Sequence, residues 1–216
     1  MKKRYFLICG LIILATLVAG LLIYPHLPER VPSHWDIHGK INGYESRLAA
    51  VLIVPAMMVL LVLAFAALPA LSPRHFEIDT FQSTYLYLML VIIVTLAYFH
   101  GLMLWAAFSP TVPMTRAILG GICVLWILMG NVLGRVRRNF YVGIRTPWTL
   151  ASEQVWYATH RLGGRAFVWT GLLGLVLTFV LPNPLMMFPC LIAGALIPVV
   201  YSFVYYKRLE REGANL

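Results

Sequence analysis

Six apolar runs, each about as long as a membrane-crossing helix, constrain the fold of this chain more than any other feature. They cover residues 5–24, 49–70, 84–107, 116–134, 166–182 and 186–206. A helix needs roughly 20 mostly apolar residues to cross the hydrocarbon core of a bilayer. Hydrophobic residues make up 61% of the chain and charged residues 12%, which leaves too little polar surface for a water-soluble fold. The sequence therefore predicts an all-α, polytopic integral membrane protein with about six transmembrane helices.

The lysines and arginines predict how these helices are oriented. With the amino terminus inside, thirteen of these cations face the cytoplasm and four face outward. The outer four are Arg30, Lys40, Arg47 and Arg116. This distribution follows the positive-inside rule. It predicts a multi-pass membrane protein with both termini cytoplasmic. The net charge of +9 then serves orientation and lipid-headgroup contact, and no direct binding of nucleic acid is predicted.

Residues 25–48, the outer loop, are rich in proline and then in glycine. This composition favours extended backbone followed by tight turns, so we expect a packed lid over the outer ends of the helices. His34 and His38 are four residues apart with Asp36 between them, and on a helix the two imidazoles would share a face. The metal-binding pattern is incomplete, and neither a metal site nor a cofactor is predicted. His34 and Trp35 remain candidates for contact with an extracellular ligand.

Residues 135–165, the inner loop, hold six arginines between apolar runs. Gly143 can take a positive φ without steric cost, and Thr146 followed by Pro147 is typical of a helix start. Thr149 would serve almost as well as the cap. A stripe at helical spacing then predicts a short amphipathic helix on the inner membrane surface or under the bundle, ended by Gly163-Gly164. The stripe consists of Trp148, Ala151, Val155, Thr159 and Leu162.

The inner loop has two interpretations that the residues leave open. It could be a re-entry element that orients the fourth and fifth spans. It could also be a docking or ligand site that uses Arg145, Trp148, His160 and Arg161.

Three features within the spans have similar alternatives. His100 is either functional or bonded to the backbone of a neighbouring helix. Asn131 could bond across helices or cap the inner loop. Gly130-x-x-x-Gly134 favours close packing of helices within the chain or, less so, a dimer face.

Two groups of residues resemble a known family. The first is Asn131-x-x-Gly134, Asn139-x-x-x-Gly143-Ile144-Arg145-Thr146-Pro147-Trp148-Thr149-Leu150, Ser152-x-x-Val155-Trp156 and Thr159-His160-Arg161-x-Gly163-Gly164. This run is similar to the SdpI family, the membrane immunity proteins against a secreted toxic peptide, the sporulation-delaying killing factor. The second is Leu27-Pro28-x-x-Val31-Pro32-x-His34-Trp35 with Gly39, Gly43 and Tyr44. It resembles the small domain of unknown function that usually precedes that family's segment.

The resemblance implies a non-enzymatic protein of the bacterial plasma membrane, with several helices, that protects its cell from a secreted toxic peptide. It also implies signalling, in which the toxin-bound protein recruits a cytoplasmic winged-helix repressor to the inner membrane face. The inner-face residues that it brings forward are Arg145, Thr146, Pro147, Trp148, His160 and Arg161, with Asn139 and Asn131 in the same motif. The short inner loop at residues 72–77 matches the family pattern only approximately.

Two other functions remain as alternatives. A small transporter would use the proline-interrupted second and sixth spans together with His100. A metal-dependent membrane enzyme would use the outer-loop histidines or His160, although no complete catalytic motif is present. We also expect two units: residues 1–70, a two-helix unit with the outer loop, and residues 71–216, a four-helix unit with the inner loop.

Overall fold

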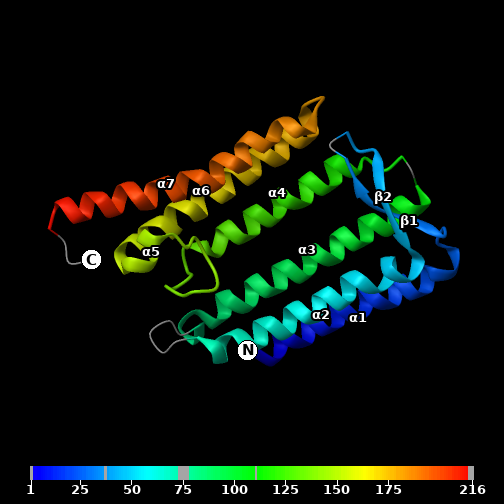
Figure 1. Ribbon diagram of the computed structural model, residues 1–216, viewed down its shortest axis with the longest axis horizontal. Helices are drawn as coiled ribbons and strands as arrows, with labels where there is room; N and C mark the ends of the chain where they lie inside the picture. Colours follow the sequence, from blue (N-terminus) through cyan, green and yellow to red (C-terminus); the bar gives the residue numbers. More distant parts are fainter. Residues whose placement is uncertain (1, 37, 73–77, 110, 214–216) are drawn as a thin grey trace.

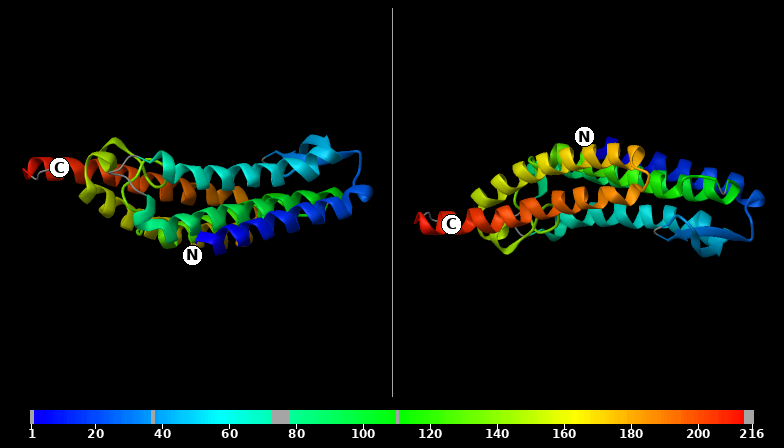
Figure 2. Two further views of the ribbon diagram at one scale, coloured as in Figure 1. Left: turned by 90° about the horizontal axis from the view of Figure 1, so that it is seen from below. Right: turned by 90° about the horizontal axis from the view of Figure 1, so that it is seen from above.

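Six long helices dominate the computed structural model, which describes residues 2–36, 38–72, 78–109 and 111–213 (Figure 1). They are α1 (Lys2–Ile23), α2 (Arg47–Leu71), α3 (Gln82–Phe108), α4 (Met114–Leu133), α6 (Glu153–Val180) and α7 (Phe188–Arg211). All six are long and apolar enough to cross a membrane. They run along the same axis of an elongated bundle (Figure 2). The predicted all-α, multi-pass membrane architecture with six spans is confirmed.

Shorter elements connect the long helices. They are η1 (Tyr24–His26), β1 (Arg30–Trp35), β2 (Ile41–Ser46), η3 (Ile78–Phe81), α5 (Pro147–Ala151) and η4 (Pro184–Met187). The strands β1 and β2 pair in antiparallel fashion, with irregular register around His34. The sequence predicted extended backbone and turns in the outer loop but no strand pair. Leu27 and Val31 are buried against Val51 of α2 and Leu104 of α3, so the outer loop is the lid that its composition predicted.

One boundary differs from the prediction. The stripe of the inner loop is divided between two helices, because α5 ends at Ala151 and Ser152 caps a new helix through its side chain. Gly163-Gly164 does not end that helix, since α6 continues to Val180. A glycine pair can end a helix or let another backbone approach it, and here it does the second.

The close approach joins α4 to α6. A Cβ added at Gly164 would lie 2.7 Å from the carbonyl oxygen of Gly130, and a Cβ at Gly130 would lie 2.8 Å from that of Gly164. Gly134 packs against Arg161 in the same way at 3.5 Å. The Gly130-x-x-x-Gly134 spacing thus serves packing within the chain. Trp126 and Phe167 pack against each other beside the crossing, with ring centroids 4.0 Å apart and the rings tilted.

The first three long helices form a second packed group. Tyr85 of α3 donates a hydrogen bond to the carbonyl oxygen of Phe65 at 2.9 Å. His100 of α3 is buried, and its Nε2 lies 2.9 Å from the carbonyl oxygen of Ala50 on α2. The interpretation of His100 as bonded to a neighbouring backbone is confirmed. Donation to a carbonyl gives this intramembrane imidazole a structural partner.

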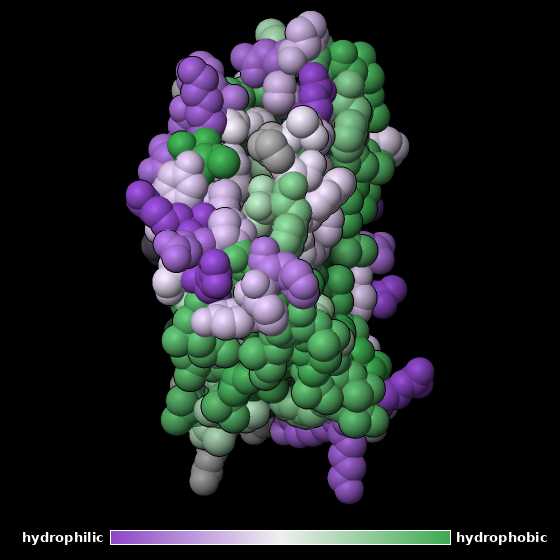
Figure 3. Space-filling model, turned by 90° about the vertical axis from the view of Figure 1, so that its right-hand side faces the viewer, coloured by the Kyte–Doolittle hydropathy of each residue, from purple (hydrophilic) through white to green (hydrophobic). Residues whose placement is uncertain are grey.

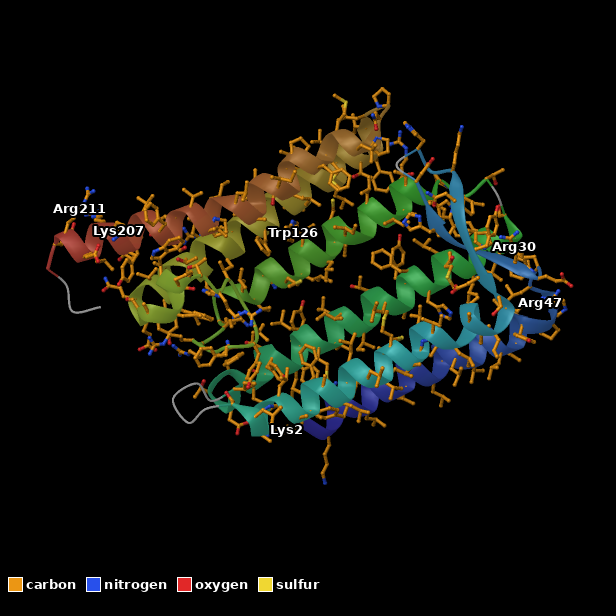
Figure 4. The ribbon with its side chains drawn as sticks, viewed as in Figure 1. Lys2, Arg30, Arg47, Trp126, Lys207 and Arg211 are labelled. Carbon is orange, nitrogen blue, oxygen red and sulfur yellow. The ribbon has the colours of Figure 1, made fainter. Side chains whose placement is uncertain are left out.

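The two ends of the bundle differ in what they carry. Both termini lie toward the end that holds α5, and the hairpin lies at the opposite end (Figure 1). Lys2, Lys207 and Arg211 mark the first end, and Arg30 and Arg47 the second (Figure 4). Arg74, counted among the inner cations, lies outside the described residues. Viewed from the hairpin end, polar residues gather over the hairpin, beside the apolar sides of the helices (Figure 3).

Candidate functional site at the inner loop

Asn139 organises the first part of the inner loop. Its side chain is 0% exposed, and its Nδ2 donates to the carbonyl oxygens of Arg137 at 2.8 Å and Val142 at 3.0 Å. Its Oδ1 accepts from the backbone N–H groups of Tyr141 at 2.8 Å and Val142 at 2.7 Å. The amide therefore makes four hydrogen bonds, which is its full capacity. This places Asn139 in the framework of the loop, since none of its polar atoms is left for a ligand.

His160 closes the next turn of the loop. Its Nε2 accepts a hydrogen bond from the Ile144 backbone N–H at 2.9 Å, and its Nδ1 lies 2.8 Å from the carbonyl oxygen of Trp156. These partners require a neutral imidazole with its proton on Nδ1. The ring also stacks on Trp156, with centroids 4.0 Å apart. His160 is 0% exposed, and both of its nitrogens are occupied, so it fastens the loop to α6.

Gly143 makes that closure sterically feasible. Its φ of 114° lies in the region that favours glycine, as the sequence predicted. A Cβ at this position would collide with His160 Nε2. Glycine is thus required here for two reasons: its backbone has a positive φ, and the His160 imidazole leaves no room for a Cβ.

Trp156 and Tyr141 attach the loop to the rest of the bundle. The Trp156 indole is fully buried, and its Nε1 donates to the carbonyl oxygen of Val136 at 2.8 Å. Tryptophans near a membrane boundary commonly anchor a protein at the interface, but the Trp156 indole is enclosed by the loop. Tyr141 donates from its hydroxyl to the carbonyl oxygen of Leu71 at 2.9 Å, which ties the loop to the end of α2. Nothing in the helical spacing pointed to either contact.

Thr146 and Thr149 form the helix start that the sequence predicted, with Thr146 as the cap. Thr146 Oγ1 accepts from the Thr149 backbone N–H at 3.2 Å, and Thr149 Oγ1 accepts from the Thr146 N–H at 2.9 Å. Pro147 follows as the first helical residue. Thr146 also lies 3.0 Å from the Ser202 hydroxyl of α7. Trp148 packs on Phe203, with ring centroids 4.9 Å apart. The capping box therefore joins α5 to α7.

Arg145, Pro147 and Arg161 stay exposed on this framework. A guanidinium N–H of Arg145 donates to the carbonyl oxygen of Phe140, which holds the end of the side chain against the loop. The stem of Arg161 lies against Gly134. The structure thus leaves Arg145 and Arg161 exposed at a loop whose interior is hydrogen-bonded. A rigid loop with exposed arginines can bind an acidic partner without first paying to become ordered.

The other predicted residues lie elsewhere. Asn131 is exposed on α4, and its side chain forms no hydrogen bond with the described part of the chain. His34 and Trp35 lie on β1, at the opposite end of the bundle (Figure 1). His34 Nδ1 lies 2.5 Å from Asn42 Oδ1, and Trp35 packs on the cluster that includes Leu102 and Met114. The candidate residues therefore form one inner group and one outer pair.

The outer histidines do not share a helical face. His34 is on a strand, and His38 lies in the turn that follows it. The backbone N–H groups of His38 and Lys40 donate to Asp36 Oδ1 at 2.8 and 2.9 Å. These bonds, the one from Lys40 most of all, lower the pKa of the Asp36 carboxyl. Among the described residues, no group of three His, Cys, Asp or Glu side chains has the arrangement of a metal site.

Comparison with known proteins shows what this loop is similar to. The family model described as the SdpI/YfhL protein family matches residues 135–202, which include the whole loop. A domain of unknown function, DUF1648, matches residues 11–59, which include the hairpin. The resemblance inferred from the two loops is thereby confirmed.

One curated relative extends the similarity to nearly the whole chain. It is the immunity protein SdpI of Bacillus subtilis (strain 168), which is 27% identical over 212 residues. The match covers 97% of this chain and 99% of the relative. No solved structure matches the chain.

Proposed function

We propose that this protein is a non-enzymatic immunity protein that protects the cell carrying it from a secreted toxic peptide. The observation that carries the proposal is the similarity to an immunity protein over 97% of the chain, with both loops included. The six apolar spans support a place in the bacterial plasma membrane, and the positions of the cations support cytoplasmic termini. The engagement of both His160 nitrogens supports a role without catalysis.

The toxic peptide would meet the protein from outside or from within the bilayer. Two features of the outer half suit an amphipathic peptide. One is the polar surface of the hairpin (Figure 3). The other is a mainly apolar groove of about 340 Å³ between α3, α4 and α6, lined by residues that include Tyr98, Gly121 and Phe179. An amphipathic peptide lying at the membrane interface could present its polar side to the first and its apolar side to the second.

A second part of the proposal concerns signalling. We infer that the inner loop recruits a cytoplasmic winged-helix repressor once toxin is bound. Arg145 and Pro147 support this, because they are exposed on a loop whose position is fixed by Asn139 and His160. The partner's surface would have to be acidic where it meets Arg145.

Survival under toxin tests the main proposal. The wild-type protein would be expressed in a host that lacks its own immunity gene, and the host would be challenged with purified killing peptide. An Arg145→Ala variant and an Arg211→Ala variant, present in equal amounts in the membrane, would be challenged in parallel. We expect the wild type and Arg211→Ala to protect. Death of the host with all three proteins would contradict the immunity function.

The Arg145→Ala result separates protection from signalling. If this variant protects but no longer brings a fluorescent repressor to the membrane, the inner loop serves recruitment alone. If it fails to protect, the loop is also needed for immunity. A repressor that stays cytoplasmic beside the toxin-treated wild type would contradict the signalling part and leave immunity standing.

A further inference from the structure

A second feature of the inner end is a pocket of about 660 Å³ between α3, α4 and α6. Three arginines contribute to its wall: Arg135 and Arg137, which follow α4, and Arg161 of α6. Ser83 and Thr84, in the first turn of α3, also line the pocket. We call this the arginine pocket. It is distinct from the face that presents Arg145, which does not line it.

The described residues leave the positive charge of the arginine pocket unbalanced. Among them, no carboxylate lines it. Glu153 reaches the pocket only through Tyr157, whose hydroxyl donates to Glu153 at 3.0 Å and accepts from Arg137 at 2.7 Å. Asp79 is engaged by Lys2 at 3.2 Å and by Gln82 at 2.6 Å. Within the described part of the chain, Arg135 and Arg161 form no ion pair.

The first turn of α3 adds to the positive potential. Phe81 occupies the cap position of this 27-residue helix, and it makes no side-chain hydrogen bond to the first turn. The first N–H groups of a helix carry partial positive charge and are common ligands for anions. The amino-terminal end of α3 and the three arginines therefore face the same pocket, and the Ser83 hydroxyl can donate a further hydrogen bond there.

A different pocket at the same end shows that the imbalance is specific. Lys207, Arg208 and Arg211 line it together with Glu210 and Glu212. Lys207 pairs with Glu210 at 2.7 Å, and Arg208 pairs with Glu212 at 2.8 Å. Two of the three α7 cations in this pocket are thus paired locally, whereas Arg135 and Arg161 have no such partner among the described residues.

We propose that the arginine pocket binds a phosphate group, supplied by the headgroup of an anionic lipid of the inner leaflet. Guanidinium groups bind phosphate through paired hydrogen bonds, and three of them with a helix end suit a group with several acceptor oxygens. The location favours a lipid source, because the pocket opens at the ends of membrane-spanning helices, where headgroups lie. This inference is independent of the proposed immunity function.

The test uses the purified full chain in detergent and measures lipid binding by native mass spectrometry. Short-chain phosphatidylglycerol is titrated against phosphatidylcholine, with and without inorganic phosphate as competitor. The pocket variant is Arg135→Gln/Arg161→Gln, and the matched control is Lys207→Gln/Arg211→Gln, which removes the same charge from the same end. Because Arg135 and Arg161 are exposed, the pocket variant should keep its fold, which its melting temperature checks. An Arg135→Lys/Arg161→Lys variant keeps the charge and removes the forked geometry.

We expect the pocket variant to bind phosphatidylglycerol about tenfold more weakly or worse, because it loses two charge-assisted contacts. The control should bind like the wild type, and the lysine variant should fall between. Displacement of the lipid by millimolar inorganic phosphate would support the phosphate site and name free phosphate as its source. Resistance to displacement would support the lipid headgroup as the source of the phosphate group. Equal binding by the pocket variant and the control would overturn the proposal. An acidic protein segment would then be the expected partner of these arginines.

Discussion

The inner and outer loops are similarly rich in motif residues, but their polar side chains are used in opposite ways. In the inner loop Asn139, Thr149 and His160 are all 0% exposed, and each is saturated with backbone hydrogen bonds. In the outer loop His34, Asn42 and Lys40 are exposed around a strand pair held mainly by its own backbone. A run of specific residues therefore encodes a fixed framework at the inner end and an accessible surface at the outer end. Pairs of matched substitutions can test this contrast.

Two glycines with positive φ give the largest expected difference. Gly143→Ala should cost about 3 kcal/mol or more, because it strains the backbone and displaces His160 from the Ile144 N–H. In the hairpin turn, an alanine at residue 39 would have to adopt a φ of 78°, and its methyl group would meet only the end of the Thr115 side chain. Gly39→Ala should therefore lower the free energy of unfolding by only about 1 kcal/mol. Unfolding by SDS titration in mixed micelles measures both. Equal costs would mean that the His160 closure contributes nothing.

The next largest difference in stability is expected between substitutions of two asparagines. Asn139→Ala removes four hydrogen bonds and leaves buried backbone groups without partners, which should cost about 2–3 kcal/mol. Asn42→Ala removes one exposed contact with His34 and should cost about 0.5 kcal/mol. The same titration compares them. A cost for Asn42→Ala as large as that for Asn139→Ala would contradict the contrast between the loops.

The costs of removing two helix caps should differ by less than the costs of the two asparagine substitutions. Thr146→Ala loses the cap of α5 and the contact with Ser202, at an expected cost of about 1–2 kcal/mol. Ser46→Ala loses the exposed cap of α2, where Ser46 accepts from the Ala49 N–H at 3.2 Å, and about 0.5–1 kcal/mol is expected. A Thr146→Ser variant keeps the hydroxyl and should recover most of the stability. If it does not, the methyl group rather than the cap explains the loss.

The smallest effect on stability is expected for two arginines. Arg145→Ala and Arg30→Ala both change exposed side chains, and each should leave the free energy of unfolding within about 0.5 kcal/mol. Recruitment of a repressor, followed by fluorescence microscopy, should nevertheless respond to Arg145→Ala alone. A large loss of stability in Arg145→Ala would place this side chain in the framework and weaken its role in docking.

The spans were predictable from the sequence because length and hydropathy alone decide whether a helix can cross a bilayer. Gly143 and Thr146 were predictable because a positive φ and a helix cap each demand particular residue types. Gly163-Gly164 was misread, since the same pair suits a helix end and a helix crossing, and only the partner Gly130 decides between them. The hairpin was missed because its prolines and glycines indicate extended chain and turns without indicating which segments pair.

The candidate site was predictable as a region but not in its roles. The sequence grouped Arg145, Thr146, Trp148 and His160, but the burial of His160 depends on Ile144 and Trp156 meeting it in three dimensions. The arginine pocket could not be found in advance, because it brings Ser83 and Thr84 of α3 together with residues that are 50 or more positions away along the chain. The division at residue 70 into a two-helix and a four-helix unit stays a prediction.

Amide hydrogen exchange of the full chain in lipid nanodiscs tests the contrast between the loops most directly. Peptides that cover residues 139–146 would be compared with peptides that cover the hairpin turn at residues 36–41. If the inner loop is a fixed framework, the amides of Val142 and Ile144 should exchange slower than those of the turn by orders of magnitude, because Asn139 and His160 hold them. Exchange of the inner loop as fast as that of the turn would contradict the account.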